Sequence, residues 1–320
     1  MEVHSRRLYD NTSRVEKDIG QPVDNKNGSC GKFSKSFEEN LNIVLNYTFN
    51  ISNDYLVRLL LDNAGIEKLS KHPFDTKTPV FVTAASSNHF GELQDLIENL
   101  RTNVTRNNET MKMIIYDIGL NETQSQLVRK ICECEYRLFP FYDYPSYFKI
   151  LINYTWKPVI IQLVLIEYDF VMWIDSSVRF NGSPLSPLYE EARTVEVKIL
   201  HGWDPIIRNT HLNTFNALGE APCMFKRREI QAGWILVKRT NFTLRAIMKP
   251  WVSCALQFGC MAQDNAEIII LSPDERNEDQ YHVCHRFDQS VIAIILTRLF
   301  NDGMDLVYGN MTKYGYIWRG

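Results

Sequence analysis

Several features that would place the chain in a common class are missing from its sequence. No stretch approaches about 18 consecutive apolar residues, so the sequence predicts no transmembrane helix. The N-terminal segment MEVHSRRLYDNTS has no apolar core of the kind found in signal peptides. The formal net charge of −3 argues against a nucleic-acid partner, because such a partner usually requires a basic surface.

Two common motifs are also missing. The seven cysteines include no Cys-x-x-Cys pair, so zinc-finger spacing is excluded. No Gly-x-Gly-x-x-Gly loop follows the first predicted strand, which weighs against a dinucleotide or methyltransferase-type cofactor site.

Glycosylation signals are abundant. Eleven of the 25 asparagines begin an Asn-x-Ser/Thr sequon, whereas ordinary Ser and Thr usage would give roughly three; the sequons begin at Asn11, Asn27, Asn46, Asn50, Asn103, Asn108, Asn121, Asn153, Asn181, Asn241 and Asn310. Because such acceptors matter only in the secretory pathway, we expect a luminal location. Chance in an Asn-rich chain is the alternative.

The cysteines agree with that location. An oxidising compartment would pair them in one to three disulfides of undetermined connectivity; the alternative is reduced cysteines scattered in the core. A luminal protein needs a targeting signal, so we expect an anchor or signal that this sequence does not contain.

The chain divides into three predicted regions. Residues 1–35 are polar and predict a disordered stem or tail. Residues 36–75 show helical periodicity and predict an N-terminal helical extension of one or two helices. Residues 76–320 predict one α/β domain with a mixed, mainly parallel sheet, because apolar strands alternate with helices of ten to fifteen residues.

The alternation defines the elements of that domain. The predicted strands are 80–85, 111–116, 136–139, 170–174, 197–200 and 229–239, and the predicted helices are 90–100, 121–131, 156–167, 240–257 and 285–300. Residues 205–228 predict loop with short helical pieces, and residues 272–279 predict a loop.

Asp175 is the central candidate. It directly follows the apolar run Val171–Ile174, and ligands of open α/β sheets bind where such strands end. A carboxylate there can hold a divalent cation on a diphosphate. The usual second acid is replaced by Ser177, so a metal would bind more weakly or borrow other ligands. The alternative is that Asp175 only caps a turn.

Two further segments carry candidate residues. Gly233 lies in the middle of a predicted strand, which indicates close approach of a ligand or simply a bulge; its neighbours Gln231 and Trp234 would contact a sugar by hydrogen bonding and stacking.

The segment CHRFDQS precedes an apolar helix, whose positive N-terminus suits an anion. There Asp288 would act on the acceptor hydroxyl or on the sugar's developing charge, Gln289 would lie beside it, and His285 would be a metal ligand. Helix capping by Asp288 is the alternative.

Four residues form a predicted nucleotide-binding group at the same sheet edge. Thr83 and Ala84 end the first strand, Asp117 ends the second and would accept the imide N–H of uracil, and Lys157 would meet a phosphate. A hydroxyl satisfied by backbone and a solvated lysine are the alternatives for Thr83 and Lys157.

In this order the motifs resemble the GT-A class of nucleotide-diphospho-sugar transferases. The segments QAGWILVKRT and HRFDQS look like the galactosyl- and xylosyltransferase branch, which has N-[TS]-G and Asp-Gln-Ser motifs and retains anomeric configuration. The segments WKPVIIQ, WIDSSVRF and CHRFDQS look still more like an invertebrate-expanded family of such domains.

The resemblance covers about residues 79–320 and implies a GT-A-like fold, a UDP-sugar donor, Mn²⁺ or Mg²⁺, a glycan or glycoprotein acceptor, and a Golgi setting with a membrane anchor. It implies that Asp175 binds metal, that Gly233 lies on the acceptor side, and that Asp288 and Gln289 are catalytic. Two departures are Ser177 and the absence of a C-terminal histidine ligand.

Two other functions remain open at this point. One is a catalytically inactive GT-A-like luminal protein that binds a glycan, and the other is a different α/β enzyme such as a methyltransferase. For the transferase, Thr83, Asp117, Asp175, Gly233 and Asp288 are expected to line one cleft.

Overall fold

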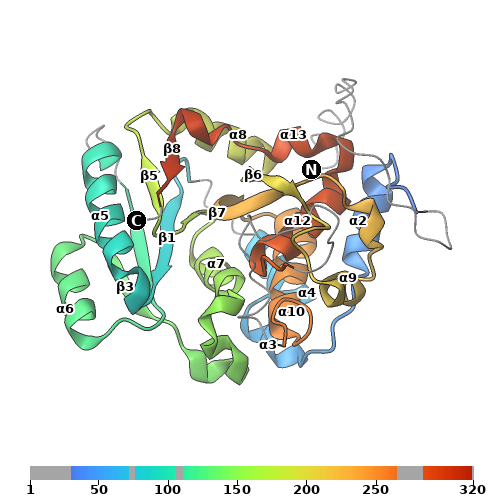
Figure 1. The fold of residues 1–320 in the computed structure, drawn as a ribbon, viewed down its shortest axis with the longest axis horizontal. Helices are drawn as coiled ribbons and strands as arrows, with labels where there is room; N and C mark the ends of the chain where they lie inside the picture. Colours follow the sequence, from blue (N-terminus) through green and yellow to red (C-terminus); the bar gives the residue numbers. More distant parts are fainter. Residues whose placement is uncertain (1–29, 72–75, 106–110, 265–283, 319–320) are drawn as a thin grey trace.

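A six-stranded mixed sheet forms the centre of the protein in a computed structural model that describes residues 30–71, 76–105, 111–264 and 284–318 (Figure 1). The strand order is β3-β2-β1-β4-β7-β6. The first four of these are parallel, and β7 pairs antiparallel with both β4 and β6. The strands are β1 (Val80–Ala85), β2 (Met113–Asp117), β3 (Glu135–Leu138), β4 (Phe170–Ile174), β6 (Val197–Pro205) and β7 (Arg228–Lys238).

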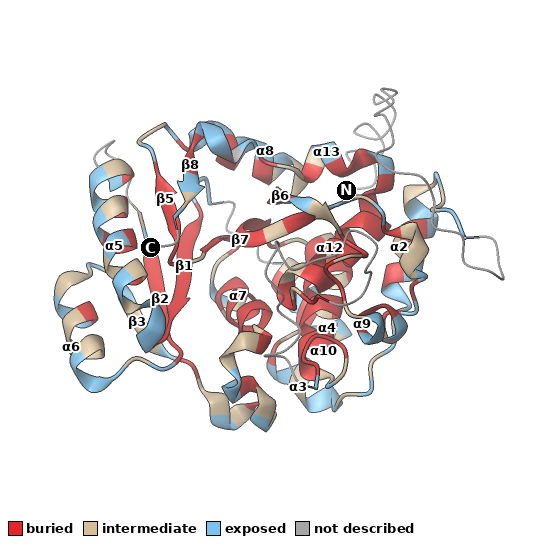
Figure 2. Cartoon of the chain, viewed as in Figure 1, coloured by how far each residue is buried: buried red, intermediate tan, exposed pale blue. Residues whose placement is uncertain are grey.

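The central strands are apolar because both faces of the sheet are covered. Every residue of β1, β2 and β4 is buried, which is typical of parallel strands between two helical layers. Figure 2 shows this buried sheet inside a shell of helices with exposed outer faces. The predicted α/β class, with its mainly parallel sheet, is confirmed.

Two separate clusters of apolar side chains lie on the two faces of the sheet. One face is covered by the N-terminal helices and by α7 (Trp156–Glu167), α10 (Lys249–Leu256) and α12 (Asp288–Phe300). The other face is covered by α5 (Phe90–Asn103), α6 (Glu122–Ile131) and α8 (Ser186–Val195). None of the helices in the described ranges is long and apolar enough to span a lipid bilayer.

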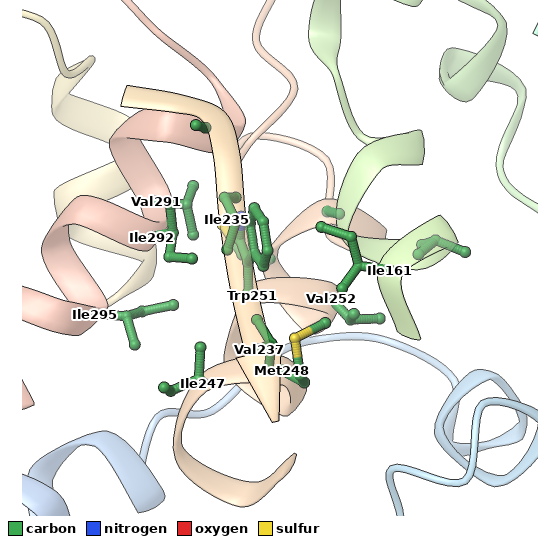
Figure 3. Close-up of a cluster of buried hydrophobic side chains, with 14 of the residues drawn as sticks. Ile161, Ile235, Val237, Ile247, Met248, Trp251, Val252, Val291, Ile292 and Ile295 are labelled. Carbon is green, nitrogen blue, oxygen red and sulfur yellow. The ribbon is translucent and has the colours of Figure 1, made fainter. Parts of the chain in front are cut away.

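The first cluster packs α7, α10 and α12 against β7. Figure 3 shows side chains from these four elements, and from the segment Thr243–Met248 just before α10, packing together; those labelled are Ile161, Ile235, Val237, Ile247, Met248, Trp251, Val252, Val291, Ile292 and Ile295. All ten are at most 1% exposed. Burying aliphatic side chains of this kind stabilises a fold by roughly 1.5–3 kcal/mol each, so this layer holds α12 firmly against the sheet.

The N-terminal region contains three helices where one or two were predicted: α2 (Phe37–Leu45), α3 (Asn53–Arg58) and α4 (Asn63–Ser70). Ser36 and Asp62 cap α2 and α4 by accepting the backbone N–H of the third residue of each helix. The region packs directly on the domain, since Gln162 of α7 donates to Leu59 O at 2.9 Å and Phe37 contacts Phe300 of α12.

Some predicted elements have different bounds in the structure. Strand β6 continues five residues beyond the predicted end at Leu200. The predicted helix 240–257 begins as expected, with Thr240 Oγ1 accepting the N–H of Thr243 at 3.1 Å, but runs as a π-helix over Thr243–Met248 before α10. The sequence reading missed α8 and the small sheet of β5 (Val178–Phe180) and β8 (Gly315–Ile317). The short helices α9 (Leu212–Ala217) and α13 (Met304–Val307) are the remaining α-helices among the described residues, and short 3₁₀ turns connect several of the elements.

Two predictions fall wholly or partly outside the described residues. The loop 272–279 lies outside them, as does the predicted stem up to residue 29. Residues 30–35 are described and are attached to the domain, because Phe33 packs edge-on against Phe225 at 5.2 Å.

The structure contains three disulfides, the upper end of the one to three that were predicted. It also shows which cysteines pair, which the sequence did not determine. They join Cys30 to Cys223, Cys132 to Cys134 and Cys254 to Cys260. Cys284 is a free, buried cysteine. The first bond links residues separated by 193 positions, so it ties the start of the described chain to the second half of the domain.

Candidate functional site

One cavity of about 1270 Å³ opens at the ends of β1 and β4, beside α7 and α12. Ligands of α/β sheets bind at this edge, and the structure places most of the predicted site residues there. Those that line the cavity are Ala84, Lys157, Asp175, Ser177, Gln231, Gly233, His285, Asp288 and Gln289.

Asp175 is fixed in place by the two strands that flank it. Its backbone N–H donates to Gly233 O at 2.8 Å, which continues the β4–β7 pairing one residue past the end of β4. Its Oδ1 accepts the indole N–H of Trp173 at 2.8 Å. The loop that follows is held by the buried Arg179, which donates to Ser176 O at 2.6 Å. The Asp175 carboxylate is therefore pre-positioned, with 31% of its side chain exposed toward the cavity.

Lys157 lies between the two candidate acids. Its Nζ is 3.1 Å from Asp175 Oδ1 and 2.8 Å from Asp288 Oδ2, and it also donates to Ala232 O at 3.3 Å. The side chain is only 2% exposed. Burial alone would lower the pKa of the Lys157 ammonium, but the carboxylates of Asp175 and Asp288 outweigh burial, and the pKa lies above its ordinary value. Lys157 is thus a charged, buried link between α7, β4 and α12.

Asp288 is the first residue of α12. Burial raises the pKa of its carboxyl to about 6, against the opposing effect of the Lys157 ammonium. Trp251 donates its indole N–H to Asp288 O at 3.1 Å. Phe287, just before it, has φ 45°, a left-handed conformation that costs energy in a non-glycine residue. The packing of α12 therefore holds a strained turn that directs this acid into the cavity.

The bulge predicted as one reading of Gly233 is present in β7. Leu200 pairs with Gln231 but Ile199 pairs with Ile235, so β7 contains extra residues opposite β6. A Cβ at Gly233 would lie 3.2 Å from Asp175 Oδ2. The absence of a side chain at Gly233 therefore lets the Asp175 carboxylate lie against the backbone of β7 without a tight contact.

Gln289 and Glu229 form a second polar group in the cavity. Gln289 Oε1 accepts the N–H of Ala232 at 3.3 Å, and the side chain of Gln289 also hydrogen-bonds to Glu229. Glu229 accepts the Nδ2–H of Asn209 at 2.8 Å. Burial raises the pKa of Glu229 to about 7, opposed by the hydrogen bonds from Asn209 and Gln289. This carboxyl gains or loses its proton near neutral pH.

His285 has a different environment from the expected metal ligand. The carbonyl of Met261 lies 3.0 Å from Nε2 and can only accept, so Nε2 carries the proton, and Nδ1 accepts the N–H of His211 at 3.3 Å. Burial lowers the pKa of His285 to about 3, so the ring is neutral. Both nitrogens hold the segment before α12 in place, and neither presents a lone pair to a cation.

Three predicted site residues lie outside the cavity lining. Thr83 is fully buried inside β1. Asp117 caps its own turn, accepting from Gly119 N at 2.8 Å and Leu120 N at 2.7 Å on Oδ1, and it accepts from the Tyr136 hydroxyl on Oδ2. Trp234 is 1% exposed and packs on Phe180 with ring centroids 5.0 Å apart. The expectation that Thr83 and Asp117 line one cleft with Asp175 is wrong for these two residues.

The sequence reading did not single out several residues of the cavity. Arg286 lines it two residues before Asp288, and Glu229 lies two residues before Gln231. Trp203 also lines the cavity with 73% of its surface exposed, beside His201. The exposed Trp203 indole next to a polar cavity is suited to stack on a sugar ring. Arg286 directly follows the predicted His285, and Glu229 lies two residues before the predicted Gln231; this proximity was the signal in the sequence that could have found them.

The residues of the cavity do not fit a divalent cation. Manganese or magnesium needs several oxygen or nitrogen ligands around one point. Across the described ranges, no three His, Cys, Asp or Glu residues are grouped so that they could hold a metal. Asp175 Oδ1 already accepts from Lys157 and Trp173, and Ser177 stands where a second acid was expected.

The chain is similar to several proteins. Residues 30–162, less than half of the chain, match a family described as "Protein of unknown function (DUF1647)". No curated protein matches the sequence.

Among solved structures, the chain is similar to the bifunctional glycosyltransferase WbbM (13% identity, TM-score 0.41, 72% of this chain and 39% of that chain). It is also similar to the galactosyltransferase LgtC in complex with donor and acceptor sugar analogues (15% identity, TM-score 0.36, 69% and 70%). A third is mouse xyloside xylosyltransferase 1 (10% identity, TM-score 0.42, 72% and 84%). The chain spans well under half of WbbM, and likenesses this distant transfer no substrate or residue role.

Proposed function

We propose that this protein is a glycosyltransferase that moves a sugar from a nucleoside diphosphate sugar, UDP-linked according to the motif resemblance, to a hydroxyl of a glycan or glycoprotein. The observation that carries the proposal is the convergence of Asp175, Lys157, Asp288 and Gln289 in one cavity at the ends of β1 and β4. Two acids, a buried cation and an amide at this sheet edge match the needs of a diphosphate leaving group and a sugar.

The reaction assigns a task to each group. An acceptor oxygen forms a bond to the anomeric carbon, the bond from that carbon to the diphosphate oxygen breaks, and the diphosphate leaves with the bonding electron pair. The acceptor proton is released to the diphosphate or to a carboxylate. Lys157 and Arg286 offset the charge on the diphosphate, which lowers the barrier electrostatically. Asp288 and Gln289 lie at the sugar, as the resemblance predicts, and retention of configuration is proposed on the same ground.

The acceptor side is proposed along Gln231 and Trp203. Gln231 extends from the bulged strand β7 into the cavity, and the exposed Trp203 presents a ring face beside it. A sugar stacked on Trp203 and hydrogen-bonded to Gln231 would direct a hydroxyl toward Asp288.

A secretory, Golgi-type location is also proposed. It rests on the sequons and on the three disulfides, which persist in oxidising compartments. Sequon asparagines at 46, 50, 181 and 310 are exposed, whereas Asn153 is buried and unavailable to an oligosaccharide in the folded protein.

The test is donor binding and turnover with the intact chain. Calorimetry with UDP, GDP and their sugars, followed by an assay of nucleoside diphosphate release, should identify one nucleotide that binds and is released from its sugar. Asp175→Asn removes one charge from the cavity without changing its size and should lower turnover by roughly a hundredfold or more, because Asp175 positions the Lys157 ammonium that offsets the charge on the diphosphate.

Asp302→Asn is the matched control. Asp302 has 70% of its side chain exposed, pairs with Arg227 on the surface, and lies outside the cavity lining, so its removal should leave turnover unchanged. If no nucleotide or nucleotide sugar binds, the transferase proposal fails and glycan binding without catalysis is favoured. Equal turnover of Asp175→Asn and Asp302→Asn would show that Asp175 takes no part in the reaction.

A further inference from the structure

Lys157 occupies the centre of an oxygen cage. Two carboxylate oxygens and one backbone carbonyl surround its Nζ, from Asp175 at 3.1 Å, Asp288 at 2.8 Å and Ala232 at 3.3 Å. Carboxylate and carbonyl oxygens are also the ligands that Mn²⁺ and Mg²⁺ prefer. The faces of Tyr154 and Trp173 close the cage at 5.2 Å and 5.5 Å from the ammonium. The Lys157 ammonium thus lies where a divalent metal ion would lie between Asp175 and Asp288.

The packing of α7 fixes the position of Lys157. It extends from the first turn of α7, where Trp156–Glu167 packs against the sheet in the main apolar cluster. The side chain is almost fully buried, and its Nζ lies 3.1 Å from Asp175 and 2.8 Å from Asp288. This geometry holds the ammonium in one place between the two carboxylates.

The ammonium itself disfavours a metal at Asp175, because its Nζ already lies 3.1 Å from Asp175 Oδ1. The other acids that line the cavity are Glu92, Asp204, Glu229 and Asp305. Among the described residues, none of them is grouped with Asp175 and Asp288 so that three ligands could hold a metal. A divalent cation at Asp175 would add two positive charges next to the ammonium, which is electrostatically unfavourable.

We infer that the nucleoside diphosphate binds to the metal-free protein, and that the Lys157 ammonium between Asp175 and Asp288, assisted by Arg286, replaces the divalent cation at this site. The inference rests on the proposed function, since it concerns how the donor diphosphate is bound. It differs from the Mn²⁺ or Mg²⁺ that the motif resemblance implied, and it accounts for Ser177 in place of a second acid.

The first experiment compares nucleotide binding with and without metal. UDP and GDP are titrated calorimetrically into the intact wild-type chain, once in EDTA and once in Mn²⁺. The expected result is one nucleotide that binds with a Kd equal within about twofold in both buffers. Arg286→Gln should weaken that binding about tenfold in both, the usual loss for one charge-assisted hydrogen bond.

The outcomes separate the two proposals. Binding only in Mn²⁺, or binding tightened more than tenfold by Mn²⁺, would overturn the inference and leave the transferase proposal standing. Absence of nucleotide binding in both buffers would overturn both. Equal binding in both buffers supports both.

The second experiment uses the metal alone. Wild-type protein should show no saturable Mn²⁺ binding by electron paramagnetic resonance, whereas Lys157→Met should gain it, because two carboxylates then face an empty cage. The double variant Lys157→Met/Asp288→Asn should lose that gain, and Lys130→Met, at an exposed position on α6, should behave as wild type. Mn²⁺ binding by the wild type that depends on Asp175 would refute the inference whether or not the lysine variants fold.

Discussion

At the scale of single residues, burial in the cavity shifts the pKa values of three titratable groups toward their neutral forms, whereas the pKa of Lys157 is raised by its two carboxylate partners. Burial raises the pKa of Asp288 to about 6 and that of Glu229 to about 7, and lowers the pKa of His285 to about 3. Buried groups of this kind concentrate at functional sites. Burial keeps each group neutral at pH values between its ordinary pKa and its shifted pKa. The free energy of unfolding therefore depends on pH in that range.

Glu229→Gln is predicted to change how stability depends on pH. In the wild type the folded chain holds a proton on Glu229 up to about pH 7, whereas the unfolded chain releases it near the ordinary pKa of 4.5. The raised pKa therefore lowers the free energy of unfolding as pH rises through this window, by about 3 kcal/mol in total. The amide of Gln does not titrate, so this loss should disappear in the variant.

Urea unfolding at several pH values between 4 and 8 measures the effect. Stability relative to the wild type should rise across the window by about 3 kcal/mol for Glu229→Gln and stay flat for Glu190→Gln, which changes an exposed residue on α8. A Glu229→Gln variant that follows the wild type at every pH would show that this carboxyl is ionised in the folded state throughout.

At the scale of elements, the site depends on a small sheet that closes over the loop after β4. Strand β8 pairs antiparallel with β5, and Trp318 donates its backbone N–H to Ser177 O at 2.7 Å. The pairing requires Gly315, because a Cβ there would lie 2.2 Å from Arg179 O. This sheet links a stretch near the C-terminal end of the described residues to the loop that holds Asp175.

Gly315→Ala is predicted to loosen that loop. The new Cβ would overlap the backbone oxygen of Arg179, which cannot move aside as a flexible side chain could. We therefore expect a loss of about 1–3 kcal/mol in the free energy of unfolding together with weaker nucleotide binding. Denaturant unfolding and calorimetry measure the two effects. The control is Gly91→Ala in α5, where a Cβ meets nothing within 4 Å; that variant should be neutral or more stable by up to about 1 kcal/mol. Equal stability of both variants would contradict the close packing of β5 and β8.

At the scale of the whole molecule, one disulfide connects distant parts of the chain. Cys30–Cys223 joins residues 193 positions apart, whereas Cys132–Cys134 joins residues two positions apart. In the chain-entropy description a cross-link stabilises the fold by restricting the unfolded state, and the effect grows with the enclosed length.

The double variant Cys30→Ser/Cys223→Ser should therefore lose up to about 5 kcal/mol of unfolding free energy, and Cys132→Ser/Cys134→Ser about 1–2 kcal/mol. Urea unfolding of the oxidised proteins compares them, with peptide mapping to verify the remaining bonds. If the short-range pair proved the more important of the two, chain entropy would not be the source of the stabilisation.

Much of the fold was predictable because its signals are local. The strands around Val82, Ile115 and Val171 are apolar on both faces, which indicates a sheet between two layers. Local patterns did not predict which face each residue of β7 presents. Ile230 and Ala232 lie in one core cluster and Trp234 and Leu236 in the other, because the bulge at Gly233 shifts the alternation by one residue. Trp234 therefore faces the core.

The sequence by itself determined the α/β class, the position of Asp175 after a buried strand, and the polar start of α12, because each depends on neighbours a few residues away. Only the tertiary structure decided which of these groups meet. Asp117 accepts a hydrogen bond from Tyr136, and Asp175 forms an ion pair with Lys157. His285 is hydrogen-bonded to the backbone of His211 and Met261. These partners come from other elements, and only packing brings them within hydrogen-bond distance. The decisive contact is between the lysine of α7 and the two acids of β4 and α12, since it places a fixed positive charge at the point where the sequence had suggested a metal.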